Sequence, residues 1–212
     1  MTKCEQKVAG IILAAGLSTR FGRPKQLLVA DGRMLPAHVL LEAKNAGLDP
    51  LILVLGHQAD AVKAQLSSPI GLQPEIIAQL TIVENSDYKS GQASSLQAGL
   101  RAVPPDVGAA IFLMGDEAGL RAEVVAKIVR AYFGPDRPLV VRPCYGGCPG
   151  GPILWSRPLF SALMTLTGDV GGRSLLKQLP LETIFQVELP TADQPWDVDT
   201  ESDFEKWLNK RG

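Results

Sequence analysis

The chain has 212 residues, of which 46% are hydrophobic, and its formal net charge is −1. This length and composition suffice for one large α/β domain or two small ones. The near-neutral charge gives no general attraction to nucleic acid or to an anionic membrane, so we expect neither as a partner. No apolar run reaches the roughly 18 residues that a membrane-spanning helix needs.

The cysteines and the first residues bear on the compartment. Three cysteines, an odd number in a long chain, argue against a disulfide framework. The first ten residues are too polar, and the apolar run after them is too short, for a secretion signal. We therefore expect a protein of the reducing cytoplasm.

Apolar runs of strand length alternate along the chain with amphipathic segments of helix length. We expect strands at residues 8–14, 51–55, 76–83, 109–114, 139–141, 153–155 and 184–189. We expect helices at residues 35–46, 57–65, 90–102, 121–133, 158–164 and 172–179. The continuous apolar runs lack the alternation of a half-solvated sheet, which predicts helices on both faces. The pattern predicts a single Rossmann-like α/β domain over residues 1–212, with a mostly parallel sheet in three αβα layers.

The regular alternation of predicted strands and helices ends after residue 141. The segment RPCYGGCPGGP, residues 142–152, has glycine or proline at five of its last six positions, and we expect it to be a loop. Its cysteines, Cys144 and Cys148, have no second pair nearby, so a zinc site is not expected. Near the end, Thr200 is predicted to cap a final helix.

The first predicted strand ends in the turn GLSTRFGRPK, residues 16–25. Its spacing matches neither a Walker loop nor the dinucleotide fingerprint. Its chemistry nonetheless suits phosphate, because glycines let backbone N–H groups approach an anion and Ser18 and Thr19 offer hydroxyls. Arg20 and Lys25 can neutralise several negative oxygens. The alternative interpretation is an ordinary strand-to-helix connection whose cations are solvated.

Three aspartates are candidate metal ligands, and Asp116 is expected at the same edge of the sheet as the glycine turn. Asp116 follows the run 109–114, and Asp197 and Asp199 point the same way if their segment is extended. Each has a plain alternative, since Asp116 can cap a turn and the pair can be a solvated start to the final helix. Carboxylates and substrate phosphates together suit Mg²⁺. Combined with the glycine turn, they predict a nucleoside triphosphate bound with Mg²⁺ beyond the carboxyl ends of the strands.

Five segments, in order, resemble one enzyme family. LAAGLSTRFGRPKQLL, from residue 13, is similar to the pattern LAAGxSxRxGxxK of nucleotidyltransferases related to the molybdenum cofactor cytidylyl- and guanylyltransferases. The other segments are NSDYKSGQASSLQAGL at 85–100, LMGDEAGL at 113–120, GPILWSRPLFSALMTLTGDVGGRSLL at 151–176 and DVDTESDF at 197–204.

The resemblance implies a Mg²⁺-dependent enzyme that transfers a nucleoside monophosphate from CTP or GTP to a phosphate acceptor and releases pyrophosphate. It implies catalytic roles for Arg20, Lys25 and Asp116, and metal binding by Asp116 and Asp199 together with Asp197. The nucleotide-binding residues that it implies are Leu13, Ala14, Ala15, Gly16, Ser18, Thr19, Arg20, Gly22, Lys25, Asn85, Gly91, Ser94 and Ser95. The LAAG form resembles the cytidylyl branch, which favours CTP.

By the same resemblance the acceptor is molybdopterin, and a molybdoenzyme would receive the product. Two departures concern this acceptor: Glu117-Ala118 replaces the QP of the GDQP motif, and Gly151 replaces the His of GHP. Two other interpretations therefore stay open. One is a nucleotidyltransferase acting on a sugar or polyol phosphate, and the other is a non-catalytic chaperone that binds nucleotide or molybdenum cofactor.

Overall fold

Strand β1 (Val8–Ala14) is an interior strand of the sheet in the computed structural model, which describes residues 7–209 except the side chain of Asp197. All seven residues of β1 are buried. It pairs in parallel with β4 (Leu51–Leu55) on one side and β6 (Ala109–Met114) on the other, and β5 (Leu80–Glu84) follows β4. Because β1 is covered on both faces, only an apolar sequence such as VAGIILA can occupy it.

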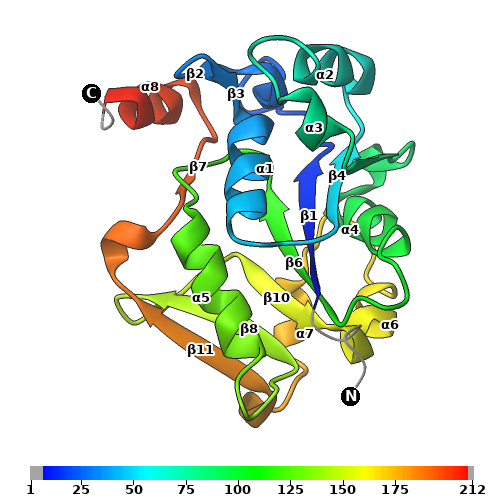
Figure 1. Cartoon of the computed structure of the whole chain (residues 1–212), viewed down its shortest axis with the longest axis vertical. Coiled ribbons are helices and arrows are strands. Elements are labelled where there is room, and N and C mark those ends of the chain that lie inside the picture. The colour runs from blue at the N-terminus through cyan, green and yellow to red at the C-terminus, as the bar shows by residue number, and fades with distance from the viewer. Residues whose placement is uncertain (1–6, 210–212) are drawn as a thin grey trace.

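The other half of the sheet is mixed. Strand β10 (Ile153–Ser156) lies antiparallel between β6 and β8 (Val140–Tyr145), and β11 (Ile184–Leu189) is parallel to β8. The full order is β11-β8-β10-β6-β1-β4-β5, with the short β9 (Cys148–Pro149) beside β8 (Figure 1). The predicted α/β class and the mostly parallel sheet are confirmed.

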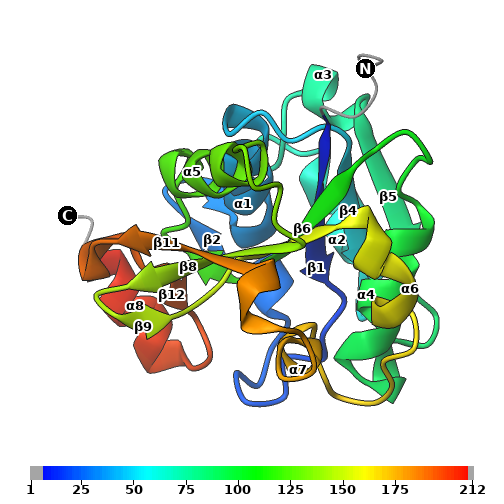
Figure 2. The ribbon, with the colours of Figure 1, turned by 90° about the horizontal axis from the view of Figure 1, so that it is seen from below.

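Helices cover both faces of the sheet (Figure 2). One hydrophobic cluster joins a face of the sheet to α1, α2, α3 and α5. A second cluster joins the opposite face to α4, α6 and α7. The bounds of these helices are Leu35–Asn45, Ala59–Leu66, Pro74–Ile77, Gln92–Arg101, Ala122–Tyr132, Phe160–Leu163 and Arg173–Leu176, for α1 to α7 in order. Among the described residues, no helix is long and apolar enough to cross a membrane.

Short elements complete the chain. The strands are β2 (Val29–Ala30), β3 (Arg33–Met34), β7 (Glu117–Ala118) and β12 (Trp196–Asp197). The 3₁₀ helices are η2 (Lys25–Leu27), η3 (Tyr88–Ser90), η4 (Arg157–Leu159), η5 (Leu181–Thr183) and η6 (Thr191–Asp193). The last helix is α8 (Glu201–Asn209), and the N–H of Asp203 donates to Thr200 Oγ1 over 3.2 Å, as expected of a capping residue.

The strand expected at 76–83 is partly wrong. The chain forms α3 up to Ile77 and begins β5 only at Leu80. Pro74 occupies the start of α3, where its fixed φ and missing N–H favour a helix. The helical start therefore overrides the strand preference of the two isoleucines that follow.

The loop expected at 142–152 is also partly wrong. Strand β8 continues to Tyr145, and the chain turns back into β9 through Gly146 and Gly147. Both glycines have positive φ, 56° and 84°, which a tight hairpin turn requires. The helices expected at 158–164 and 172–179 are shorter, since η4 and α6 share the first and α7 is one turn of the second.

We predict that Gly99→Ala destabilises the fold. A Cβ at Gly99, in α4, would lie 2.4 Å from Cγ2 of Ile11, a buried β-branched residue of β1 that has no room to move. Overpacking should cost about 1–3 kcal/mol of unfolding free energy. This exceeds the roughly 1 kcal/mol that alanine gains over glycine within a helix.

The measurement is denaturant unfolding of Gly99→Ala beside Arg101→Ala, which places alanine on the exposed side of the same helix. The control should stay within about 0.5 kcal/mol of the wild type. A Gly99→Ala protein more stable than the wild type would contradict the close packing of α4 on β1.

Candidate active site

A cleft of about 960 Å³ opens beyond the carboxyl ends of β1 and β6. One side is the glycine loop, residues 16–25, which follows β1. The opposite side, here called the far wall, consists of residues 149–155 and 169–173, from the β9–β10 segment and the approach to α7. The start of α4 and the segment after β6 lie between them. Parallel α/β sheets commonly bind ligands at this edge.

Most of the residues singled out in the sequence line this cleft. Those that do are Leu13, Ala14, Ala15, Gly16, Ser18, Thr19, Arg20, Lys25, Gly91, Ser95, Asp116 and Asp199. Gly22, Asn85 and Ser94 do not line it. Gly22 has a φ of 79° within the glycine loop. Asp197 lies in β12, and its side chain is outside the described part of the chain.

The glycine loop is held together from inside by a buried amide. Gln26 Nε2 donates to the carbonyl of Gly16 over 2.7 Å, and Ser18 Oγ donates to Gln26 Oε1 over 3.3 Å. The backbone N–H of Lys25 in turn donates to Ser18 Oγ over 3.0 Å. Ser18 has a φ of 56°, a conformation that few residues other than glycine adopt without such support. These bonds close the loop around its own backbone.

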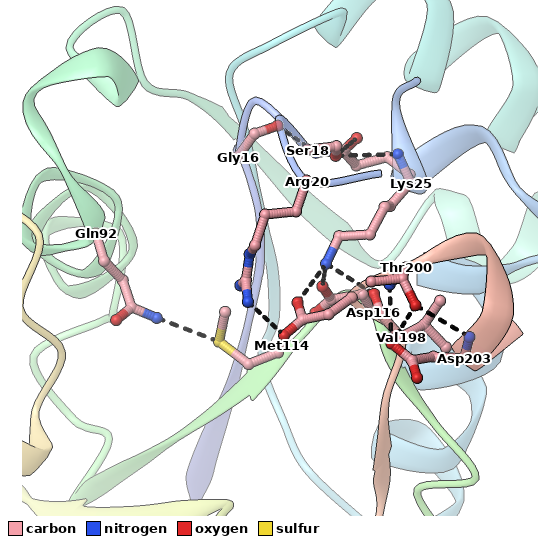
Figure 3. A network of polar contacts seen from close by, with 12 residues as sticks. Gly16, Ser18, Arg20, Lys25, Gln92, Met114, Asp116, Val198, Thr200 and Asp203 are labelled. Atoms are coloured by element: carbon pink, nitrogen blue, oxygen red, sulfur yellow. Dashed lines mark hydrogen bonds and ion pairs between the residues drawn. The ribbon is translucent and has the colours of Figure 1, made fainter. Parts of the chain in front are cut away.

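Two cations of the glycine loop meet two carboxylates at the sheet edge (Figure 3). Lys25 Nζ contacts Asp116 Oδ2, and lies 3.2 Å from Asp199 Oδ1. It also donates to the carbonyl of Val198 over 2.8 Å. Arg20 Nη1 lies 2.8 Å from the other oxygen of Asp199. The Lys25 side chain is 13% exposed, whereas that of Arg20 is 73% exposed. The ion pair between Lys25 and Asp116 is therefore better shielded from solvent than the pair between Arg20 and Asp199.

The same carboxylates suit a divalent cation. Asp116 and Asp199 direct oxygens toward one point, which the ammonium of Lys25 occupies in the protein alone. Among the described side chains, no group of three His, Cys, Asp or Glu residues is placed to hold a metal. Mg²⁺ is typically held by one or two carboxylates with substrate phosphates and water completing its shell. The donor set therefore fits a metal that arrives with a phosphate ligand.

Asn85 organises the start of α4. Its Nδ2 donates to Ser94 Oγ over 2.8 Å and to Ser95 Oγ over 3.0 Å, and its Oδ1 accepts the N–H of Asp87 over 3.0 Å. Asn85 and Ser94 thus lie behind the cleft and hold Ser95 at its surface. Gly91 allows a close approach, since a Cβ there would lie 2.3 Å from the backbone of Gly168 in the segment leading to α7.

Glu117 and Gly151, two positions at which the sequence departs from the pattern it resembles, lie close together. Glu117 is buried, and its Oε2 accepts the N–H of Met114 over 3.1 Å. Tyr145 donates its hydroxyl to the carbonyl of Gly151 over 2.8 Å, and burial, with a contribution from Glu117, raises the pKa of Tyr145. Glu117 and Tyr145 both line the cleft near the far wall. Tyr145 is therefore a neutral hydrogen-bond donor that shapes the wall.

Sequence reasoning missed several cleft residues. Gln26 and Arg173 are the main examples, and Gln92, which bonds the sulfur of Met114 over 3.4 Å, is another (Figure 3). A polar residue directly before two leucines was a signal for Gln26, since a buried amide needs partners. Trp155 is buried in the second hydrophobic cluster and also lines the cleft.

The other residues weighed in the sequence stand apart from this chemistry. Cys144 and Cys148 form no disulfide. Cys144 is buried, and its pKa is raised by burial and by the carboxylate of Glu188. His38 contacts the carbonyl of Ala30 over 2.9 Å and packs on Trp207. None of these features supplies a nucleophile beside the carboxylates.

A family model described as the MobA-like NTP transferase domain matches residues 10–183. Nicotine blue oxidoreductase of Paenarthrobacter nicotinovorans is 32% identical over 185 residues, which cover 82% of this chain and 83% of that protein. The molybdenum cofactor cytidylyltransferase of Escherichia coli K12 is 28% identical over 197 residues, 92% of each chain. A match to the bifunctional protein GlmU of Anaeromyxobacter is 34% identical, but it covers only 26% of GlmU. This chain thus spans about a quarter of the GlmU relatives that it matches.

Solved structures agree with this relationship over nearly the whole chain. The Rv0371c homologue from Mycobacterium sp. strain JC1 has a TM-score of 0.80 and 30% identity, covering 97% of both chains. Rv0371c of Mycobacterium tuberculosis H37Rv in complex with manganese has a TM-score of 0.75 and 27% identity, covering 97% of this chain and 99% of that one.

We predict that Gln26→Ala loosens the glycine loop. The change leaves the carbonyl of Gly16 and the hydroxyl of Ser18 without their buried partner, which should cost about 1–3 kcal/mol. Hydrogen exchange of the loop amides should speed up, and the unfolding free energy should fall. Gln79→Ala, at an exposed glutamine bonded to Lys44, is the matched control and should change neither. Unchanged exchange in Gln26→Ala would show that the loop does not depend on this amide.

Proposed function

We propose that this chain, which belongs to the MobA-like NTP transferase family, is a nucleotidyltransferase that transfers CMP from CTP to the phosphate of a molybdopterin-type acceptor and releases pyrophosphate. The observation that carries the proposal is the convergence of Arg20 and Lys25 with Asp116 and Asp199 in one cleft. Two polyanions must meet for this reaction. Arg20 and Lys25 would contact their phosphates, and Asp116 and Asp199 would hold a divalent cation that neutralises phosphate charge.

The preference for CTP is supported at the start of the glycine loop. Ala15 is buried, lines the cleft and holds the N–H of His57 on its carbonyl over 3.1 Å, so its position is fixed. A glycine here would leave more room for a larger base. One methyl group typically discriminates between ligands by about 1–3 kcal/mol. Similarity to the molybdenum cofactor cytidylyltransferase of Escherichia coli supports the same choice.

The proposed reaction is an in-line displacement. An oxygen of the acceptor phosphate forms a bond to the α-phosphorus of CTP, while the bond from that phosphorus to the α–β bridging oxygen breaks. Pyrophosphate leaves with the electron pair of the broken bond. The attacking phosphate is already an anion, so no strong general base is required. Positioning and charge neutralisation therefore account for the rate.

Each residue of the cluster has a role in this scheme. Arg20, whose side chain is exposed, would pair with the β- and γ-phosphates, and Lys25 with the α-phosphate. Glycine-loop N–H groups would bind the remaining oxygens. Asp116 and Asp199 would hold Mg²⁺ or Mn²⁺, which neutralises phosphate charge when bound. Rv0371c has been solved with manganese, which supports a divalent cation in this family.

The first test is release of pyrophosphate by the wild type and by Asp116→Asn. The wild type should release pyrophosphate with CTP and molybdopterin only when Mg²⁺ or Mn²⁺ is present. Asp116→Asn should lose about 10²–10³-fold in turnover, because one of two metal-binding carboxylates is gone. Asp136→Asn, at an exposed position, is the matched control and should keep full turnover.

Four outcomes would redirect the proposal. Faster turnover with GTP would change the nucleotide, and turnover with a sugar phosphate but not molybdopterin would change the acceptor. Tight CTP binding without any turnover would favour the chaperone interpretation. A redox reaction in place of pyrophosphate release would point instead to the oxidoreductase chemistry in the name of nicotine blue oxidoreductase.

A second test concerns Lys25 itself. Without nucleotide, Lys25→Met should bind Mn²⁺ about tenfold more tightly than the wild type, because no ammonium then competes for Asp116 and Asp199. Its turnover should fall by at least about 10²-fold, since a phosphate-binding cation is lost. Electron paramagnetic resonance of free Mn²⁺ measures the binding. Lys177→Met, on the surface, should leave both quantities unchanged. Equal or weaker Mn²⁺ binding by Lys25→Met would refute the competition.

A further inference from the structure

Two arginines lie on the face of the sheet that α7 covers; Arg173 belongs to the far wall, whereas Arg142 does not itself line the cleft. Arg173 opens α7 and lines the cleft. Arg142 lies in β8 two residues after Val140, whose side chain packs in the cluster beneath α7. Side chains alternate along a strand, so Arg142 points to the same face as α7. Close enough for their charges to interact, the two guanidiniums repel one another.

Neither guanidinium has an ion-pair partner within the described part of the chain. Among the groups that the structure describes, none forms a hydrogen bond or an ion pair with the guanidinium of Arg142 or with that of Arg173, which is exposed to solvent. The Nε of Arg142 is buried and has no acceptor. Burial, and then the charge of Arg173, lower the pKa of Arg142. Two adjacent cations, one with a buried donor unpaired, form an arrangement that an anion would stabilise.

Gly151 has no side chain and so leaves space beside the guanidinium of Arg173. A Cβ at Gly151 would lie 3.4 Å from Nη2 of Arg173 and 3.9 Å from Oε1 of Glu117. The guanidinium of Arg173 therefore lies beside Gly151, in space that a larger side chain at position 151 would partly occupy. It also approaches the residue that directly follows Asp116. Arg173 thus reaches from the far wall toward the reaction edge.

We propose that Arg173 binds the phosphate monoester of the acceptor, with Arg142 beside it as a positioning residue that raises the local positive potential. This inference rests on the proposed function, because it assigns the acceptor of that reaction to the far wall. The triphosphate is served from the other side by Arg20 and Lys25. Strand β8 is two positions from β6 in the sheet, about 10 Å at the usual strand spacing, so the two cationic groups can bind separate phosphates.

The test measures KM for CTP and for molybdopterin separately. Arg173→Ala should raise KM for molybdopterin at least tenfold and leave KM for CTP within twofold. Arg173→Lys keeps the charge but not the planar fork, and should give an intermediate value. Arg130→Ala, at an exposed arginine of α5, is the matched control and should change neither constant. An unchanged KM for molybdopterin, or an increase confined to CTP, would overturn the inference.

The role of Arg142 needs a measurement whose result differs between a residue that positions phosphate and one that only supports the fold. Arg142→Met removes a partly buried cation without a partner, so the variant should melt at a higher temperature than the wild type. It should nonetheless have a several-fold higher KM for molybdopterin. A lower melting temperature with an unchanged KM would mean that Arg142 only supports the fold.

A binding experiment separates this inference from the proposed function. Calorimetry with inorganic phosphate, on protein already saturated with CTP and Ca²⁺, needs no turnover. If the wild type binds phosphate and Arg173→Ala binds it at least tenfold more weakly, the anion site stands even where no molybdopterin is converted. Equal phosphate binding by both proteins would refute the site, whichever acceptor the enzyme proves to use.

Discussion

The parallel pairing of β1 with β6 determines where the charged residues meet. Leu13 pairs with Met114, and the N–H of Gly115 continues the register to the carbonyl of Leu13 over 2.9 Å. Both strands therefore end at one edge, and each chain turns there. A Cβ at Gly115 would come within 2.9 Å of Ala14 Cβ, so a glycine is needed at the close approach. The contact between Lys25 and Asp116 follows from this register.

The C-terminal segment completes the cluster through a separate piece of sheet. Strand β12 pairs antiparallel with β7, which begins one residue after Asp116. Phe21 of the glycine loop shares a small hydrophobic cluster with Val198, Phe204 and Trp207. The charges at the cleft therefore depend on apolar contacts between segments about 180 residues apart. Burying Phe21 fixes the glycine loop, and burying Val198 holds Asp199 beside it.

Much of the central fold was predictable because its signals are local. A strand covered on both faces must be continuously apolar, and β1, β4 and β6 are. Because the carboxyl ends of parallel strands lie at one edge of the sheet, Asp116 could be predicted to lie near the glycine loop. The approach of Asp199 was not derivable from spacing, since it depends on β12 pairing with β7. Its assignment came from the resemblance to a family.

The errors and omissions have a shared cause in packing across long sequence separations. Glycine and proline in residues 142–152 are equally compatible with a loop and with a tight hairpin, and the partner that selects the hairpin is β8 itself. Arg173 could not be placed because α7 is a single turn whose position depends on Gly91 accommodating the backbone of Gly168. In the sequence, Gln26 is a single polar residue beside an apolar run. Its role becomes apparent only from its hydrogen bond to the carbonyl of Gly16.

The distribution of charge in the cleft favours a nucleotide that arrives with its metal. Lys25 is already paired with two carboxylates, so free nucleotide would have to break those ion pairs to use its charge. A divalent cation bound to the phosphates would pair with Asp116 and Asp199 in place of Lys25 and would leave the ammonium for the α-phosphate. This exchange would keep each of these charges partnered, which a metal-free nucleotide would not do. The guanidinium of Arg173 at the far wall has no ion pair to lose among the described residues, so it would remain available to a second anion after the first has bound.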